Sequence, residues 1–340
     1  MNKEVILTGI RANNDLHIGN YFGALLPMVD MAKNRSGEFQ VNLFVPDLHS
    51  FTTPIDHSKL QEQIMHNLKI FVAAGLPLDN ENIHIYRQSY IAAHSEMTWI
   101  LDCFTGFGEM SRMTQFKDRS AKLGNDRVSV GVFNYPVLMA TDILLYGAKY
   151  VPVGDDQSQH LEFTRDIAMR MNSQFGELFK LPEPVAKQHE FFGKDQGLRI
   201  KDLADPSKKM SKSDDSEKGV IFMGDDPEAA AQKIMSATTD SEASVGNPDP
   251  KERPGVANLL QIYGLLKPDH PDVSGMSYQE FKQAVSDAVK GFLTGFQAKL
   301  LQVDDTAIVN KLTSDEAKMT EQANTTLLKV QQAVGLRPKS

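Results

Sequence analysis

The sequence predicts an α/β fold, in which a doubly wound parallel sheet is followed by a mostly helical C-terminal part. Two observations lead to this prediction. In the first part of the chain, short apolar stretches alternate with stretches of helical periodicity, which is the pattern of parallel strands joined by helices. Beyond about Asp214 the strand signals fade, and the remaining stretches have helical periodicity.

Strands and helices are expected to alternate in the first part. The expected strands are the apolar stretches at residues 4–10, 39–47, 82–88 and 150–154. The expected helices lie at residues 18–32, 58–75 and 157–172. Pro27 should interrupt the first helix, because proline lacks a backbone N–H. Ligands bind at the carboxyl ends of strands in such sheets, so the segments after Ile10, Val45 and Val153 are the expected walls of a site.

The second part is expected to be a separate helical domain. Its predicted helices lie at residues 226–239, 255–266, 277–302 and 314–336. The polar, turn-rich stretch 239–255 between them is expected to be a loop. Because 340 residues are about twice the usual domain size, we divide the chain into residues 1–205 and residues 206–340.

Composition limits the classes of function. The formal net charge of -8 argues against general binding of polyanions such as DNA, so any contact with nucleic acid needs a local basic patch. The single cysteine, Cys103, excludes an internal disulfide framework and a cysteine-cluster zinc site, and we expect no metal-binding residues. No secretion signal and no apolar run of about 18 residues is visible, so we expect a cytoplasmic protein without a membrane partner.

The turn after the first strand, at residues 9–25, contains an unusual set of side chains. His17 and Asn20 lie one helical turn apart at the start of the predicted helix, where free N–H groups favour phosphate. Gly19 lacks a side chain, so a flat base could approach the backbone closely. The alternative interpretation is a capped helix with an incidental histidine. The turn alone leaves both interpretations open.

A second feature is the lysine loop, which we define as residues 205–219. Lys208, Lys209 and Lys212 lie among serine, aspartate and glycine with few apolar residues, which is typical of a mobile loop. Such lysines could close over a polyphosphate and supply charge as it develops. A solvated, charged loop is the alternative for a generic sequence of this kind, but the string Lys209-Met210-Ser211-Lys212-Ser213 is highly specific.

Together these two features resemble the paired signatures of class I aminoacyl-tRNA synthetases. The first is His17-Ile18-Gly19-Asn20, and the second is the lysine string at residues 209–213. The closest resemblance is to the tryptophanyl-tRNA synthetase family, and it extends over nearly the whole chain, including the stretches at residues 113–121, 135–168 and 253–263. A tyrosine-specific relative is the nearest competitor, but its typical glycine-glycine-serine-aspartate-glutamine stretch is replaced here by residues 153–162.

The resemblance implies a ligase of protein biosynthesis. It would activate L-tryptophan with ATP and Mg²⁺, forming an adenylate and pyrophosphate, and would then transfer tryptophan to tRNA(Trp). Residues 1–205 would form a Rossmann-type catalytic domain with the ATP site, the amino-acid site and the dimer interface of a homodimer. Residues 206–340 would supply the lysine loop and a helical domain on the anticodon side of the tRNA.

The resemblance also implies roles for individual residues. The ATP-binding residues would be Arg11, His17, Gly19, Asn20, Gly154, Asp156, Gln157, Lys209, Met210, Ser211 and Lys212. The catalytic residues, which would stabilise the leaving pyrophosphate, would be Lys117, Lys209 and Lys212. The tryptophan-binding residues would be Gly9, His49, Tyr135, Met139, Asp142, Ile143, Val151, Val153 and Gln157.

Helical spacing supports one of these groups independently. Tyr135, Met139 and Asp142 fall on one face of a helix. A stripe of apolar residues is usually core, but a carboxylate on such a face needs a partner if it is buried. The resemblance makes Asp142 the acceptor of the indole N–H.

Arg11 departs from the family pattern, since it adds a charge where the family is neutral. Following the first strand directly, its side chain is expected to contact the substrate carboxylate or an ATP phosphate. The alternative is an ion pair with a local carboxylate such as Asp15. Two other classes of function also remain: a small-molecule nucleotidyltransferase, and a non-catalytic paralogue that senses RNA or tryptophan.

Overall fold

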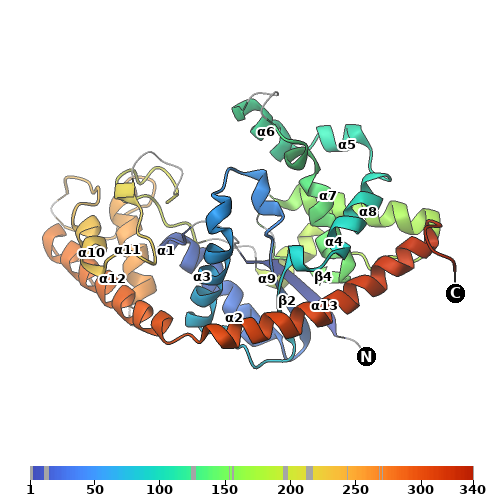
Figure 1. Ribbon diagram of the computed structural model, residues 1–340. Coiled ribbons are helices and arrows are strands. Elements are labelled where there is room, and N and C mark those ends of the chain that lie inside the picture. Colours follow the sequence, from blue (N-terminus) through green and yellow to red (C-terminus); the bar gives the residue numbers. More distant parts are fainter. Residues whose placement is uncertain are drawn as a thin grey trace.

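The protein was analysed as a computed structural model, which describes residues 3–10, 15–123, 128–152, 154, 157–193, 198–211, 217–242, 244–267, 269 and 271–339. A four-stranded parallel sheet lies at its centre, with the strand order β3-β2-β1-β4. The strands are β1 (Glu4–Gly9), β2 (Phe39–Val45), β3 (Ile83–Arg87) and β4 (Ala148–Tyr150). Helices flank this sheet, so the predicted α/β class is confirmed (Figure 1).

The strand order creates a crevice at one edge of the sheet. The chain adds β2 and β3 on one side of β1 and then crosses over to add β4 on the other side. Connections therefore diverge at the carboxyl ends of β1 and β4, which is where ligands bind in such sheets. Strand β4 ends at Tyr150, where the predicted strand 150–154 was expected to begin, so this prediction was displaced toward the C-terminus. The N–H of Val151 donates to the side-chain oxygen of Gln188 at 2.9 Å instead of extending the ladder.

The helices predicted at residues 18–32, 58–75 and 157–172 are confirmed, whereas the helices at residues 93–102, 107–111, 114–123 and 185–192 were not predicted. The described residues of the first part form α-helices and shorter helical turns. They are α1 (Ile18–Asn20), η1 (Tyr21–Leu25), α2 (Leu26–Arg35), η2 (His49–Thr52), η3 (His57–Lys59), α3 (Leu60–Ala73), η4 (Gln88–Tyr90), α4 (Ala93–Asp102), α5 (Phe107–Ser111), α6 (Thr114–Leu123), α7 (Val130–Leu145), α8 (Ser158–Phe175) and α9 (Val185–Phe192). Residues 21–25 form a wider π-helical turn just before Pro27. There the N–H of Leu26 bonds to the carbonyl of Tyr21, as expected where proline disturbs a helix.

The second part is helical, as predicted. Its elements are η7 (Glu217–Gly219), α10 (Pro227–Met235), α11 (Pro254–Leu266), α12 (Tyr278–Leu301) and α13 (Asp305–Ala333). Helices α10, α11 and α12 pack together, whereas α13 runs back along the molecule and packs on β3, α4 and α7 (Figure 1). The last helix therefore covers the first part of the chain although it belongs to the second part of the sequence.

Each face of the sheet is covered by its own cluster of buried apolar side chains. Ile6 lies in the cluster shared with the first helices and with α11 and α12. Val5 and Leu7 lie in the other cluster, with α4, α7 and α8. This alternation follows from the two-residue period of a strand.

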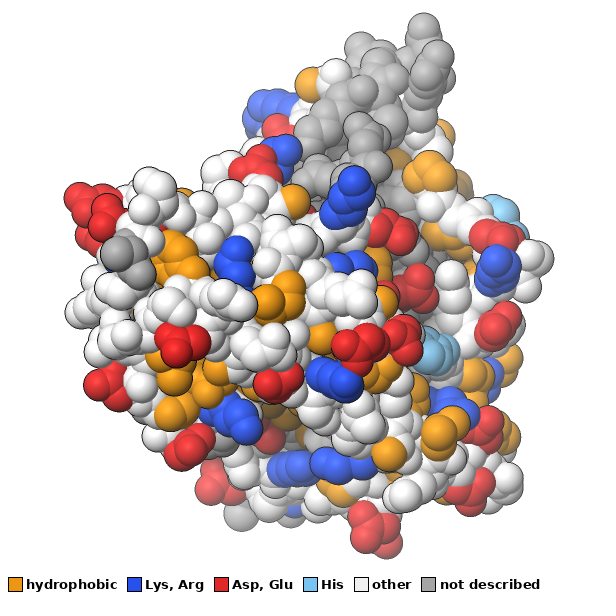
Figure 2. Space-filling view, turned by 90° about the vertical axis from the view of Figure 1, so that its left-hand side faces the viewer, with side chains coloured by type: hydrophobic (Ala, Val, Ile, Leu, Met, Phe, Trp, Pro, Cys, Tyr) orange, Lys and Arg blue, Asp and Glu red, His pale blue; other side chains and the backbone are white. Residues whose placement is uncertain are grey.

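The surface of the helical part has mixed charge. Figure 2 views the molecule from the side of α10, α11 and α12, and there lysine and arginine side chains are interspersed with acidic ones. Across the described part of the chain, no helix is both long and apolar enough to cross a membrane.

Candidate active site

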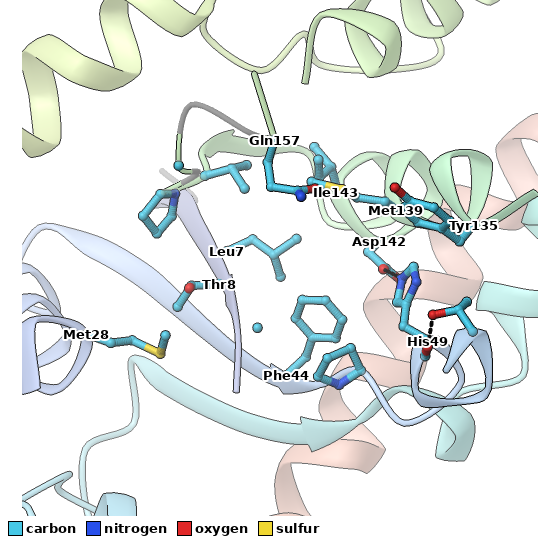
Figure 3. A pocket seen from close by; sticks show the side chains of 16 residues that line it. Leu7, Thr8, Met28, Phe44, His49, Tyr135, Met139, Asp142, Ile143 and Gln157 are labelled. Atoms are coloured by element: carbon cyan, nitrogen blue, oxygen red, sulfur yellow. Dashed lines mark hydrogen bonds and ion pairs between the residues drawn. The ribbon is translucent and has the colours of Figure 1, made fainter. Parts of the chain in front are cut away.

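A cavity of about 400 Å³ opens at the carboxyl ends of the strands (Figure 3). It is lined by Leu7, Thr8, Gly9, Met28, Phe44, Pro46, His49, Thr52, Tyr135, Met139, Asp142, Ile143, Val151, Pro152, Gly154 and Gln157. These residues come from β1, β2, α2, η2, α7 and the segment after β4. The lining is largely apolar with a few polar groups, which is typical of a small-molecule site.

The cavity brings together most of the residues that the sequence assigned to tryptophan. They are Gly9, His49, Tyr135, Met139, Asp142, Ile143, Val151 and Gln157. Val153 lies outside the described residues. In Figure 3, Tyr135, Met139, Asp142 and Ile143 line one side of the cavity from a single helix, while Leu7 and Phe44 form its floor.

Several lining residues were not predicted from the sequence. They are Leu7, Thr8, Met28, Phe44, Pro46, Thr52 and Pro152. Leu7 and Phe44 look like ordinary strand core, and only the position of the strand ends distinguishes them. A Cβ at Gly9 would make an ordinary contact with the Phe44 ring at 3.5 Å, so this glycine gave no signal for Phe44 either.

Asp142 is buried in the wall of the cavity and accepts three hydrogen bonds from side chains. Its side chain is 1% exposed. Oδ1 accepts hydrogen bonds from Gln88 Nε2 at 2.7 Å and from His94 Nδ1 at 2.7 Å, and Oδ2 accepts one from His49 Nε2 at 2.9 Å. Burial alone would raise the pKa of Asp142, but the hydrogen bonds with His49 and His94 lower it below its usual value. Asp142 is therefore an ionised carboxylate, and it can only accept hydrogen bonds.

The segments that hold these donors are tied to each other. His49 follows β2 and Gln88 follows β3, and Asp47 joins the two segments. Asp47 is buried and accepts hydrogen bonds from the N–H groups of Leu48 at 3.1 Å and Ser89 at 2.8 Å. This link fixes the two donors at neighbouring strand ends.

Tyr135 is oriented by a residue of the next helix. Its hydroxyl lies 2.9 Å from His160 Nε2 on α8. The rings of Tyr135 and His49 meet edge to face, with centroids 6.2 Å apart. Helix α7, which contains Tyr135, is capped by Ser129, whose side chain accepts a hydrogen bond from the N–H of Val132 at 3.3 Å.

The predicted phosphate turn is also a capped helix. The N–H of Asn20 donates to His17 Nδ1 at 3.2 Å, and the N–H of His17 donates to Asn20 Oδ1 at 3.4 Å. A Cβ at Gly19 would lie 3.0 Å from the His17 ring, so any larger residue there would make this ring shift. The capping interpretation is thus realised in the structure, and it leaves the nucleotide role of these residues a hypothesis.

The turn and the region after the lysine loop are held together by backbone hydrogen bonds. The N–H of Ile18 donates to the carbonyl of Ile221 at 2.9 Å, and the N–H of Met223 donates to the carbonyl of Leu16 at 2.8 Å. Within the loop, the N–H of Met210 donates to the carbonyl of Ile200 at 3.0 Å. The Met210 side chain is buried in the core, so it anchors the loop, whereas the neighbouring Lys209 is exposed.

Other predicted residues are not brought to the site. Lys117 is an exposed residue of α6, and this helix projects from the body next to α5, apart from α1 (Figure 1). Arg11, Asp156 and Lys212 lie outside the described residues. Among the described residues, no group of three or more His, Cys, Asp or Glu side chains could hold a metal ion.

Comparison with known families gives a match over most of the chain. The model described as "tRNA synthetases class I (W and Y)" matches residues 2–302.

Curated relatives named tryptophan–tRNA ligase are similar over nearly the full length. The relative from Caldanaerobacter subterraneus subsp. tengcongensis is 38% identical over 336 residues, which are 97% of this chain and 98% of the relative. The relative from Corynebacterium glutamicum is 39% identical over 338 residues, which are 97% of this chain and 94% of the relative.

Solved structures give the same picture. The tryptophanyl-tRNA synthetase from Mycoplasma pneumoniae aligns with a TM-score of 0.81 at 34% identity, over 98% of both chains. The tryptophanyl-tRNA synthetase from Campylobacter jejuni, solved with ADP and tryptophan, aligns with a TM-score of 0.78 at 29% identity, over 97% of this chain and 99% of that chain.

Proposed function

The chain belongs to the class I tRNA synthetases for tryptophan and tyrosine, and from this premise we propose that the cavity at the strand ends is its tryptophan site. The chain activates L-tryptophan with ATP and attaches it to tRNA(Trp), as its relatives named tryptophan–tRNA ligase do. The observation that supports this location best is Asp142, a buried, ionised carboxylate in the wall of an otherwise apolar cavity.

Asp142 accepts the indole N–H in this proposal. A carboxylate offers about four acceptor positions, and three of them are filled by Gln88, His94 and His49. The fourth is available to a donor in the cavity. Met139 and Ile143 lie beside Asp142 on the same helix and contact the flat faces of the ring. An indole donates one hydrogen bond and is otherwise apolar, so its chemistry matches this wall.

The first chemical step needs no catalytic base. The tryptophan carboxylate is already ionised, and its oxygen attacks the α-phosphorus of ATP while the bond to pyrophosphate breaks. The chain therefore acts by positioning the reactants and by stabilising the phosphoryl transition state. In the second step, a hydroxyl of the terminal adenosine of the tRNA attacks the carbonyl carbon of the adenylate, and AMP leaves.

ATP binds in the crevice next to the tryptophan cavity. Gly154 and Gln157 line the cavity at the switch point of the sheet, and the proposal places the nucleotide there. The proposal keeps the ATP-binding role of the other residues predicted for it: Arg11, His17, Gly19, Asn20, Asp156, Met210 and Ser211. Mg²⁺ arrives bound to the ATP phosphates, its usual mode in such enzymes. Lys117, Lys209 and Lys212 stabilise the leaving pyrophosphate, and Lys117 needs a movement of α6 to do so.

The proposal also includes a homodimer. Three large apolar side chains on α4, α5 and the start of α7 are strongly exposed: Trp99 at 71%, Phe107 at 77% and Val130 at 80%. Exposed apolar residues on neighbouring elements mark an interaction surface, and a second copy of the chain covers it in this proposal. The catalytic part, 1–205, and the tRNA-binding part, 206–340, keep their predicted roles, and the protein works in the cytoplasm, where tRNA is charged.

Tryptophan-dependent exchange of pyrophosphate into ATP tests the proposal. Wild-type protein should exchange pyrophosphate with tryptophan, and not with tyrosine or without an amino acid. Lys209→Ala should lower the exchange rate constant about 10²-fold with a smaller change in the Michaelis constant for ATP, because a loop lysine acts mainly in the transition state. Lys251→Ala, which removes an exposed lysine from the 239–255 loop, is the matched control.

Three outcomes would contradict the proposal. Exchange without any amino acid would indicate a small-molecule nucleotidyltransferase. Tryptophan binding without exchange would indicate a sensor. An equal loss in the Lys209 and Lys251 variants would remove the specific role of Lys209.

A further inference from the structure

A buried histidine behind the cavity has no role in the reaction described above. His94 lies on α4, is fully buried and does not line the cavity. Its Nδ1 is 2.7 Å from Asp142 Oδ1, and its Nε2 is 2.9 Å from the hydroxyl of Tyr146. Both ring nitrogens therefore have partners.

The direction of these hydrogen bonds follows from the partners. Asp142 is ionised and can only accept, so Nδ1 of His94 donates to it. In a neutral His94 ring with its proton on Nδ1, Nε2 is an acceptor, and the hydroxyl of Tyr146, whose pKa is raised by burial, donates to it. The result is a chain of two hydrogen bonds that runs from Tyr146 through His94 to Asp142.

This chain restricts the carboxylate of Asp142. Oδ1 receives two donors from the interior of the protein, His94 and Gln88. Oδ2 accepts a hydrogen bond from His49, whose side chain is 19% exposed and lies at the edge of the cavity. The two interior donors fix the orientation of the carboxylate. In this orientation, Oδ2 is the oxygen that has an acceptor position left for a ligand.

We propose that His94 is a positioning residue for recognition of the indole N–H: by donating to Oδ1, it holds Asp142 so that Oδ2 accepts from the substrate. This inference rests on the proposed tryptophan site. It predicts that His94 affects only ligands that have an N–H at this position. A histidine with a purely structural role would affect all ligands of the same shape alike.

Two substitutions separate the two hydrogen bonds of His94. In His94→Asn, the side-chain amide can reach the position of Nδ1, so the donor to Asp142 is kept and the contact with Tyr146 is lost. In His94→Gln, the amide reaches the position of Nε2, so the contact with Tyr146 is kept and the donor to Asp142 is lost. Both changes leave a polar side chain in a polar position, which limits the loss of stability.

The ligands for the test are tryptophan and β-(benzothiophen-3-yl)alanine, in which sulfur replaces the indole N–H at nearly the same shape. The measurement is the ratio of their dissociation constants for each full-length variant. His94→Gln should lower the preference for tryptophan by about 10-fold, because one hydrogen bond to a charged group is lost. His94→Asn should stay within about 5-fold of wild type, as expected for the loss of the Tyr146 contact alone, and binding of the analogue should change little in either variant.

A second buried histidine offers a matched control. His84 lies on β3 and does not line the cavity, and its Nδ1 is 3.3 Å from Oδ1 of Asp315 on α13. His84→Gln should lower the melting temperature without changing the ligand ratio.

Two results would overturn the inference. The first is an unchanged ratio in His94→Gln, and the second is an equal loss of both ligands in both His94 variants. If either variant does not fold, the other still decides: a normal ratio in His94→Gln or a 10-fold loss in His94→Asn contradicts the inference. A wild-type protein without preference for tryptophan would instead contradict the proposed tryptophan site itself.

Discussion

Two buried aspartates of this molecule have similar surroundings and different uses. Asp142 on α7 and Asp315 on α13 are both almost fully buried, and each has a histidine and at least two other donors around it. Asp315 accepts from the N–H of Ile85 at 2.8 Å, lies 3.3 Å from His84 Nδ1 and pairs with Lys311 at 3.2 Å. Only Asp142 lines the cavity.

The position of Asp315 explains its role. Strand β3 is an edge of the sheet, and its free backbone N–H groups would otherwise lack partners. Asp315 and Glu316 of α13 accept from the N–H groups of Ile85 and Arg87. Glu316 also binds the Arg87 guanidinium through two hydrogen bonds, at 2.6 and 2.9 Å. The difference between the two aspartates therefore lies in what their last acceptor positions face, which is protein for Asp315 and a cavity for Asp142.

The largest effect is expected on stability, when the hydrogen bonds and the ion pair of Asp315 are removed. Asp315→Ala removes the acceptor of the Ile85 N–H, and it leaves the buried His84 and the half-buried Lys311 without this partner. The free energy of unfolding should fall by about 3–5 kcal/mol, the usual loss when one member of a buried ion pair is removed. Denaturant titration measures it. In the folded fraction, the ratio of the dissociation constants for tryptophan and the benzothiophene analogue should stay at the wild-type value. A shift in that ratio would mean that the hydrogen bonds of Asp315 influence those of Asp142.

Much of the fold could be predicted from the sequence because its signals are local. The strand–helix alternation and the break at Pro27 are visible within short windows. The docking of α13 is not, since Asp315 and Glu316 in an amphipathic helix look like a solvated face. Their partners lie on β3, more than two hundred residues earlier in the chain.

A smaller effect is expected at the aspartate that faces the cavity. Asp142→Asn keeps the shape but loses the charge, and it can present an N–H₂ group to the indole N–H. The specificity constant for tryptophan should fall roughly 5- to 150-fold, which corresponds to a loss of about 1–3 kcal/mol of transition-state stabilisation. The Michaelis constant for ATP should change little. Steady-state exchange kinetics give both values. Asp102→Asn is the control, since Asp102 accepts from Asn134 outside the cavity. Equal losses in the two variants would remove Asp142 from the tryptophan site.

Only part of the candidate site could be predicted, because only some of its residues lie close together in the sequence. Tyr135, Met139 and Asp142 share one helix face, so their spacing could indicate a common surface. His94 gave no such signal, because it sits among apolar residues and its partner lies on another helix. Gln88 was expected as the end of a strand, and only the folded sheet brings it to Asp142.

The smallest effect is expected two hydrogen bonds away from the cavity, at Tyr146. Tyr146→Phe removes the hydroxyl that donates to His94 but keeps the buried ring. The His94 ring then loses one of its two fixed contacts and holds Asp142 less firmly. The preference for tryptophan over the benzothiophene analogue should fall by about 2- to 5-fold, since one neutral hydrogen bond is worth about 1 kcal/mol and acts here through two residues. Tyr263→Phe, at a buried tyrosine of the helical part, should leave this preference unchanged. If Tyr146→Phe also leaves it unchanged while His94→Gln lowers it, Asp142 is positioned by His94 and Gln88 alone, and the chain of hydrogen bonds that matters for recognition ends at His94.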